Sequence, residues 1–120
     1  MIRTAFVVAL VAGAVAASVA FAAPQTAGTL NGTVGPGYTI TLKQHGKVVK
    51  TLKAGTYKLV IADKAQIHAF SLDGPHGYAK DFTTVPFVGT KTFTVKLQAG
   101  SYKYYCPPHE SIMFGRFQVR

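Results

Sequence analysis

The C-terminal part of the chain carries three side chains with electron-pair donors close together: Cys106, His109 and Met113, spaced C-x2-H-x3-M. Cys106 is the only cysteine, and another donor, His68, lies upstream in an apolar run. Two imidazoles, one thiolate and a weak axial thioether are the ligand set of a mononuclear blue-copper electron-transfer site. The residue types and spacing therefore predict one copper ion held by His68, Cys106, His109 and Met113.

The spacing suits a carrier that must hold both oxidation states of copper with little rearrangement. The C-x2-H spacing lets two ligands on one turn reach the same metal, and Met113 follows where the chain can curl under the ion. Gly115 then frees the backbone to begin a last strand. Because His109 lies in a loop, we expect its outer ring edge to meet solvent and to be the point of electron exchange.

Each donor also has a plain structural explanation. Cys106 could be a buried thiol that packs as a small hydrophobe, and Met113 could fill a gap in the core. His68 could be an ordinary histidine at the end of a strand. Glu110 could replace Met113 as the axial ligand, but its place next to His109 should point it away. These alternatives leave the copper site as the interpretation that uses all four donors together.

The chain has two other histidines after residue 22. His45 lies in the turn Gln44-His45-Gly46 with no other ligand type near it, and we expect an exposed polar residue. His76, in Gly74-Pro75-His76-Gly77, is a surface loop residue or a rival ligand.

Strand-like patterns separated by glycine-rich turns run through the chain, and no useful helical period follows residue 22. The segments 53–60 and 98–105 resemble each other, each a small turn leading into a β-rich strand. Asp73 to Thr90 is expected to be a long functional loop. The pattern predicts an all-β sandwich of about seven to eight strands, with strand candidates that include Tyr38–Leu42, Ala65–Leu72 and Thr92–Leu97.

The first 22 residues have a short basic start, an apolar stretch and the small-residue ending Ala20-Phe21-Ala22. These features predict a secretory signal peptide over 1–22, and the alternative is an uncleaved membrane anchor. We expect a flexible N-terminus over 23–33, one domain over 34–120 and no membrane span after cleavage. The protein is then exported to a periplasm, a cell envelope or the extracellular space.

The whole chain has 13 lysine and arginine residues against 4 acidic ones. The basic residues form no adjacent run and no recognition helix is evident, which argues against nucleic-acid binding. The basic residues either form an ordinary solvated surface, or they attract an acidic protein partner or an anionic cell envelope. A lone cysteine in an exported protein needs an explanation, and metal ligation supplies one.

The sequence resembles the cupredoxin family, especially its small plastocyanin-like members and exported bacterial domains. The matching features are the segment Ile67 to Pro75 around His68 and the run Cys106 to Met113 before a terminal strand over 115–119. The resemblance covers about residues 34–120. It implies a Greek-key β-sandwich, a type 1 copper ion, no enzymatic activity, and a monomer that exchanges electrons with a redox protein such as a cytochrome or a copper enzyme.

The resemblance also implies an apolar docking patch around the outer edge of His109. Candidate members are Pro107, Pro108 and Phe114, with Pro75, Pro86 and Phe87 from the long loop.

One departure from the family concerns the tie between the first histidine and the cysteine. Many members have asparagine after the histidine, whereas this chain has Ala69 there and Pro107 after Cys106. Since Pro107 and Pro108 lack backbone N–H groups, we expect the Cys106 sulfur to accept few hydrogen bonds, with the Ala69 amide as its donor.

Other functions use the same residues differently. A copper storage or delivery protein would pass on the metal itself, and a metal-free cell-envelope binding module would not bind copper tightly. A cysteine nucleophile would need an activating base. A multicopper oxidase would need more than four histidines, and a binuclear copper centre would need a second cysteine.

Overall fold

The computed structural model describes residues 9–18 and 25–120. Residues 9–18 are exposed and form no helix or strand. The expected cleavage point after Ala22 and the flanking parts of the segment 1–22 lie outside the described residues. Within the described ranges, no helix is long and apolar enough to cross a membrane.

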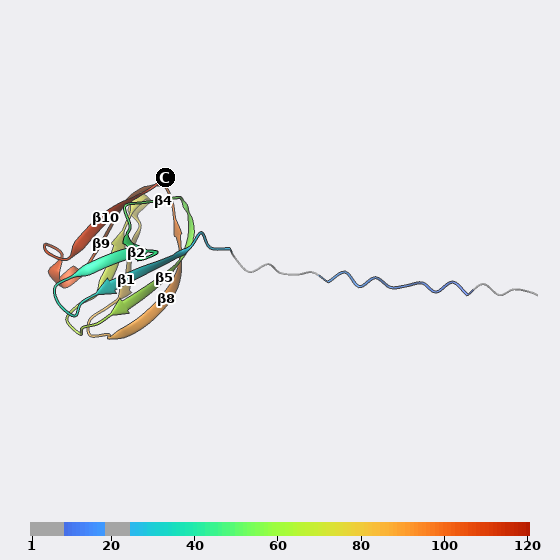
Figure 1. Cartoon of the computed structure of the whole chain (residues 1–120), viewed down its shortest axis with the longest axis horizontal. Helices are drawn as coiled ribbons and strands as arrows, with labels where there is room; N and C mark the ends of the chain where they lie inside the picture. The colour runs from blue at the N-terminus through green and yellow to red at the C-terminus, as the bar shows by residue number, and fades with distance from the viewer. Residues whose placement is uncertain (1–8, 19–24) are drawn as a thin grey trace, which may run out of the picture.

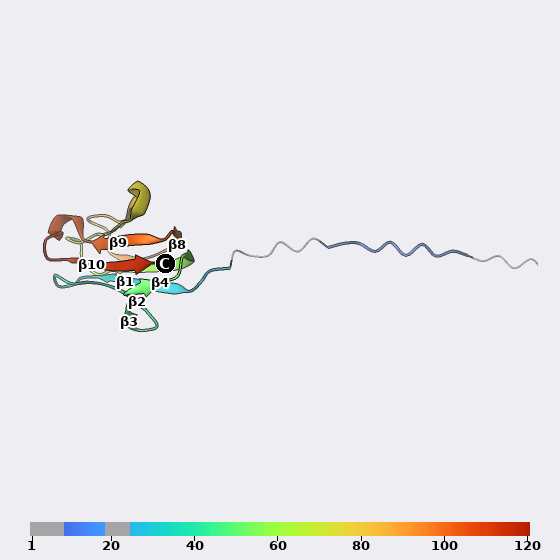
Figure 2. The same ribbon diagram turned by 90° about the horizontal axis from the view of Figure 1, so that it is seen from above.

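Two five-stranded sheets pack face to face (Figures 1 and 2). The first, called sheet A, has the order β3-β2-β1-β5-β8, with β3 Lys47–Val48, β2 Ile40–Gln44, β1 Thr29–Val34, β5 Gly55–Asp63 and β8 Gly89–Leu97. The second, called sheet B, has the order β4-β10-β9-β6-β7, with β4 Thr51–Leu52, β10 Phe114–Val119, β9 Gly100–Tyr105, β6 Phe70–Asp73 and β7 Ala79–Thr83. Strands β1 and β5 are parallel, as are β4 and β10, and the other pairs are antiparallel.

Alternating side chains build the core between the sheets. Tyr57, Leu59 and Ile61 on β5 are buried, and the residues between them point outward. Tyr102 and Tyr104 on β9 face them from sheet B, and the Tyr102 ring stacks on Phe117 of β10. This period of two is what a strand with one solvated face requires.

The two similar sequence segments form the same corner in the two sheets. The Tyr57 hydroxyl donates to the Lys53 carbonyl at 2.7 Å just before β5, and the Tyr102 hydroxyl donates to the Gln98 carbonyl at 2.9 Å just before β9. Each bond spans four residues and fastens the turn to the strand that follows, as a tyrosine corner does in β-sandwiches.

Four loops meet at one end of the sandwich, which we call the ligand pole: residues 35–39, 64–69, 84–88 and 106–113. The strand register shows this, because Val34 pairs with Asp63 and Asp63 with Gly89 where their strands reach these loops. In sheet B, Tyr105 pairs with Phe114 at the ends of the 106–113 loop. The chain enters the sandwich at the opposite pole, where β1 begins.

The prediction of an all-β two-sheet sandwich is confirmed. The structure has ten strands rather than seven or eight, because two of them, β3 and β4, are only two residues long. The strand predicted over Ala65–Leu72 begins only at Phe70, and the one predicted over Tyr38–Leu42 begins at Ile40.

The segment expected to be one long loop contains regular structure. A 3-10 turn, η1 (Pro75–Gly77), and strand β7 interrupt it, so only residues 84–88 remain as a loop at the ligand pole. Pro75 lies at the opposite pole, where a Cβ on Gly100 would meet its ring at 2.7 Å. The prediction that Pro75 belongs to the docking patch is therefore wrong, because β6 carries the chain away from the ligands before the turn.

Candidate metal centre

His68 reaches the ligand pole on the loop that follows β5. The Lys64 amide donates to the Val34 carbonyl at 2.9 Å, and the Ala65 amide donates to Oδ1 of the buried Asp63 at 3.3 Å. The His68 amide then closes a short turn on the Ala65 carbonyl at 3.2 Å. These bonds fix the loop, and the His68 side chain is fully buried.

Gly35 of the neighbouring loop packs against the His68 ring. Its φ of +75° is in the left-handed region that favours glycine. A Cβ there would lie 2.9 Å from His68 Cδ2. A larger residue at position 35 would therefore push on the imidazole.

The other candidate ligands lie on one closed loop between β9 and β10. The Cys106 amide donates to the Met113 carbonyl at 3.0 Å, the His109 amide to the Cys106 carbonyl at 2.9 Å, and the Met113 amide to the His109 carbonyl at 2.9 Å. The 3-10 turn η2 (Pro107–His109) carries the chain from Cys106 to His109. The loop backbone is thus tied at each ligand position.

Three of the four candidate side chains converge. The Nδ1 atoms of His68 and His109 are 3.3 Å apart, and the Cys106 Sγ is 3.8 Å from the first and 3.6 Å from the second. The point equidistant from these three atoms lies about 2 Å from each, which is the length of a metal–nitrogen bond. The triangle therefore has room for one ion bonded to all three atoms.

The chemistry of the donors supports the same fit. Two imidazole nitrogens that face one another at 3.3 Å cannot both accept without a proton or a cation between them. An Nδ1 that binds a metal leaves the ring proton on Nε2. In His68 it is Nδ1 that faces the other two donors, whereas Nε2 is buried with no hydrogen-bond partner among the described residues. Two nitrogens and a sulfur with free electron pairs are the in-plane donors that copper prefers.

Met113 is almost completely buried and ends the same loop. The structure thus brings His68, Cys106 and His109 together. Met113 lies on the same loop as Cys106 and His109. Its role as a weak axial ligand stays a prediction.

The Cys106 sulfur accepts a hydrogen bond from the Ala69 amide at 3.4 Å, as expected from the sequence. Pro107 and Pro108 have no backbone N–H that could donate to the sulfur. In the part of the chain that the structure describes, Ala69 is the one backbone donor to this sulfur. This bond joins the two ligand loops directly at the site.

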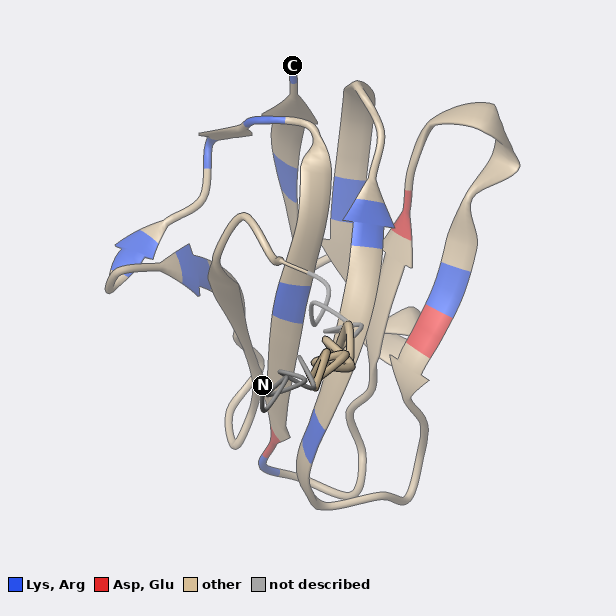
Figure 3. Ribbon diagram, turned by 90° about the vertical axis from the view of Figure 1, so that its right-hand side faces the viewer, with Lys and Arg blue, Asp and Glu red and all other residues tan. Residues whose placement is uncertain are grey.

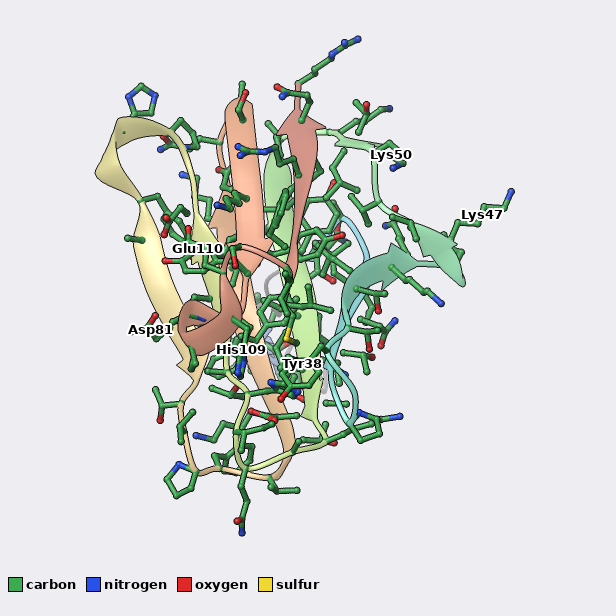
Figure 4. The ribbon with its side chains drawn as sticks, turned by 90° about the vertical axis from the view of Figure 1, so that its left-hand side faces the viewer. Tyr38, Lys47, Lys50, Asp81, His109 and Glu110 are labelled. Atoms are coloured by element: carbon green, nitrogen blue, oxygen red, sulfur yellow. The ribbon has the colours of Figure 1, made fainter. Side chains whose placement is uncertain are left out.

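Tyr38 is a site residue that the sequence reasoning missed. Its ring meets the His68 ring at a centroid distance of 5.5 Å and the His109 ring at 5.0 Å, edge to face in both cases. Figure 4 shows Tyr38 beside His109 at the ligand pole. The ring is 58% exposed, so it covers the imidazole pair from the solvent side. The sequence signal for this role was the position of Tyr38 directly after Gly37, before the next strand begins. The alternating pattern of 38–42 concealed it by suggesting that Tyr38 belongs to the strand.

Exposed apolar side chains gather on and beside the loops of the ligand pole, and we call them the apolar rim. Ile67, Val85, Val88, Ile112 and Phe114 are exposed large hydrophobic residues on or beside the loops of the ligand pole. His109 is half-buried among them, whereas His68 and Cys106 are fully buried.

Acidic groups lie to one side of this rim, around Tyr105. The Tyr105 hydroxyl donates to Asp73 at 3.2 Å, and Lys103 pairs with Glu110 at 2.9 Å. Burial and then the charge of Asp73 raise the pKa of Tyr105. Burial also raises the pKa of Tyr104, opposed by a hydrogen bond to the Leu42 backbone. Both phenols therefore keep their protons near neutral pH.

The rival ligands lie away from the three donors. Glu110 points to solvent and pairs with Lys103, as its position next to His109 predicted. His76 lies in η1 at the opposite pole, and His45 lies in the β2–β3 turn, both exposed. Within residues 9–18 and 25–120, the group that could hold a metal is His68, Cys106 and His109.

Comparison with known proteins agrees with this centre. Residues 33–120 match the family described as copper binding proteins, plastocyanin/azurin family. No curated protein sequence matches the chain.

Among solved structures, the fold is similar to rusticyanin, a copper protein, at a TM-score of 0.56 and 20% identity, covering 77% of this chain and 76% of that one. Rusticyanin from Thiobacillus ferrooxidans matches at a TM-score of 0.52 and 24% identity with the same coverage. Reduced rusticyanin gives a TM-score of 0.53 and 22% identity over 77% of this chain and 78% of that one.

The fold, the three converging donors and the match over residues 33–120 lead to one assignment. The chain belongs to the plastocyanin/azurin family of copper-binding proteins, and its cofactor is one copper ion.

Proposed function

We propose that this chain is an exported type 1 copper protein that carries single electrons between redox partners by outer-sphere transfer through His109. The observation that carries the proposal is the convergence of two Nδ1 atoms and one Sγ at a buried site. His68, Cys106 and His109 would hold the copper ion, and Met113 would be a fourth, weaker ligand.

Copper supplies the one-electron couple when it is bound. The protein's part is to hold the donors in one arrangement for both oxidation states. The amides of Cys106, His109 and Met113 are each bonded within their loop, and the Ala69 amide bonds the sulfur. Loops fixed in this way resist rearrangement of the donors, which keeps electron exchange fast.

His109 is the ligand through which electrons pass, because it is the donor with an exposed edge. Tyr38 and the apolar rim exclude water around that edge and give a partner an apolar surface to contact, bordered at Phe114 by Lys103 and Arg116. Pro107, Pro108, Phe114, Pro86 and Phe87 complete the docking patch. No substrate bond is made or broken, so the patch needs only a small and brief contact.

The partner is a redox protein, such as a cytochrome or a copper enzyme, that meets the ligand pole of a monomer. Residues 1–22 direct the chain out of the cytoplasm and 34–120 form the copper domain. Copper ligation also accounts for an unpaired cysteine in an exported protein, since a ligated thiolate is shielded from disulfide pairing.

A pair of rate measurements tests electron transfer against copper delivery. The copper-loaded protein is mixed with a redox partner, and separately with a copper-free acceptor protein that binds copper more tightly. We expect a reversible one-electron couple and electron exchange much faster than passage of the metal. If the metal passes to the acceptor faster than electrons are exchanged, the protein is a copper delivery protein. If it does not bind copper tightly, the metal-free binding module is the remaining function.

A further inference from the structure

The outer face of sheet A is basic and free of acidic side chains. Its strands alternate, so Lys43 on β2, Lys58 on β5 and Lys96 on β8 all point away from the core. The only acidic residue in these five strands is Asp63, which is buried. We call the outward-pointing residues of sheet A the basic face. Figure 3 shows lysine bands across this sheet, while the acidic bands lie at its end or on other strands.

The register places the three lysines diagonally across the sheet. Lys43 pairs with Asn31, Lys58 with both Thr29 and Thr94, and Lys96 with Thr56. Threonine and asparagine therefore fill the space between the lysines. The result is a broad polar surface with separated positive charges. Lys47 on the edge strand β3 and Lys50 in the loop that follows it add positive charge at that edge of sheet A (Figure 4).

Sheet B has a different charge balance. Asp73, Asp81 and Glu110 lie on β6, on β7 and in the 106–113 loop. Each has a partner within the protein: Tyr105, Ser71 and Lys103 respectively. The strands of sheet A thus carry five lysines against one buried aspartate, whereas the basic and acidic residues of sheet B and its 106–113 loop balance.

We propose that the basic face binds the surface of an anionic lipid bilayer. The face lacks what a protein interface uses, since its only exposed large hydrophobic residue is Val48 on the edge strand β3. Protein interfaces centre on buried aromatic and arginine anchors. Separated lysines instead suit a fluid surface, whose anionic headgroups can move to meet each charge. Because the described strands of the basic face expose no apolar segment that could insert, the contact that this face makes is electrostatic and reversible.

This orientation leaves the ligand pole free. The loops with His68, Tyr38 and His109 lie at the end of the strands, whereas the basic face lies along their side. A protein held by sheet A therefore presents its copper ligands along the plane of the membrane, where a membrane-bound redox partner could reach them. Binding of the basic face to lipid does not depend on copper. The lipid proposal can therefore fail while the proposed electron transfer holds, and the proposed electron transfer can fail while the lipid proposal holds.

The test compares two triple variants of equal charge. One removes the basic face (Lys43→Gln, Lys58→Gln, Lys96→Gln), and the control removes three charges outside it (Lys80→Gln, Arg116→Gln, Arg120→Gln). Binding is measured by co-sedimentation with vesicles of neutral phosphatidylcholine, and with vesicles that also contain anionic phosphatidylglycerol. The difference between the two vesicle types isolates the electrostatic contribution from any apolar insertion of the N-terminal segment. Copper loading of each variant confirms the fold.

We expect the unchanged protein to prefer the anionic vesicles and to dissociate at high salt, where charges are screened within about 3 Å. The basic-face variant should lose about a hundredfold in partitioning, since each lysine near such a surface contributes about fivefold. The control should lose much less. Equal loss in both variants would overturn the proposal in favour of net charge alone. Binding to soluble polyglutamate but not to anionic vesicles would overturn it in favour of an acidic protein partner.

Discussion

The ligand pole and the basic face use opposite chemistry on the same sandwich. At the ligand pole, the Tyr38 ring lies against the half-buried His109 imidazole, and Ile112 exposes apolar surface on the same loop as His109. On the basic face, lysines and threonines are exposed and the apolar side chains of the same strands point inward. The difference is what the two proposals need: a small apolar contact for electron exchange at the pole, and a charged surface on the face for a negatively charged partner.

The largest expected effect is on copper affinity, and it distinguishes the ligand pole from the opposite pole of the sandwich. His109→Ala should weaken copper binding by more than about a hundredfold, because even residues that only orient a metal ligand contribute 10–100-fold to affinity. The matched control is His76→Ala in η1 at the opposite pole, which should leave affinity unchanged. Chelator competition measures both. A similar loss in the two variants would contradict the assignment of His109.

One substitution made in each region tests whether their tasks are separate. Ile112 and Val48 are both exposed, at 63% and 44%, the first on the ligand pole and the second beside Lys43 on the basic face. Ile112→Glu should slow electron self-exchange between reduced and oxidised protein about tenfold, since like charges then meet at the contact. Val48→Glu should leave that rate unchanged and weaken binding to anionic vesicles several-fold.

Magnetic resonance line broadening measures the self-exchange rate in mixtures of the two oxidation states. The separation of tasks would be refuted if Val48→Glu slowed exchange as much as Ile112→Glu did.

A smaller effect concerns the ring that covers the imidazoles. Tyr38→Ala removes two edge-to-face contacts, each worth about 0.5–1.5 kcal/mol. Copper should pass to a chelator about tenfold faster, while the visible absorption stays the same because the ligands remain. Tyr38→Phe keeps the ring and should behave like the unchanged protein. Equal release rates for the alanine variant and the unchanged protein would show that Tyr38 does not cover the site.

The smallest effect lies in the core that separates the two regions. Burial raises the pKa of Tyr104, so the folded state holds this proton more tightly than the unfolded state does. That contribution to stability is complete below about pH 10, the ordinary tyrosine value, and is lost as the pH rises through the raised pKa. Urea unfolding should show a falling free energy above pH 10, and Tyr104→Phe should make this fall less steep. An unchanged slope would mean that Tyr104 ionises as freely when folded as when unfolded.

The candidate ligands on the C-terminal loop could be predicted because their spacing is local. The structure places Cys106 and His109 at one point with His68, and Met113 as a fourth ligand stays a prediction. His68 was harder, since the loop before β6, rather than a strand, positions it. The hydrogen bond from the Ala69 amide to the sulfur was predictable because Pro107 and Pro108 have no backbone N–H to donate.

The features that the sequence did not reveal depend on pairing between distant segments. Strand β7 reads AKDFT, with three exposed residues, and becomes a strand only because β6 pairs with it at the sheet edge. Tyr38 contacts the imidazoles because two sheets bring loops 35–39 and 106–113 together. The basic face exists only once β2, β5 and β8 are aligned in one sheet.

The most direct test is the visible spectrum of the protein loaded with Cu(II). The account predicts an intense blue absorption that depends on the Cys106 thiolate, so Cys106→Ala should be colourless. If Cys106→Ala retains the full absorption, or if the unchanged protein binds copper without it, the assignment of the sulfur and two imidazoles as ligands of one copper ion is wrong.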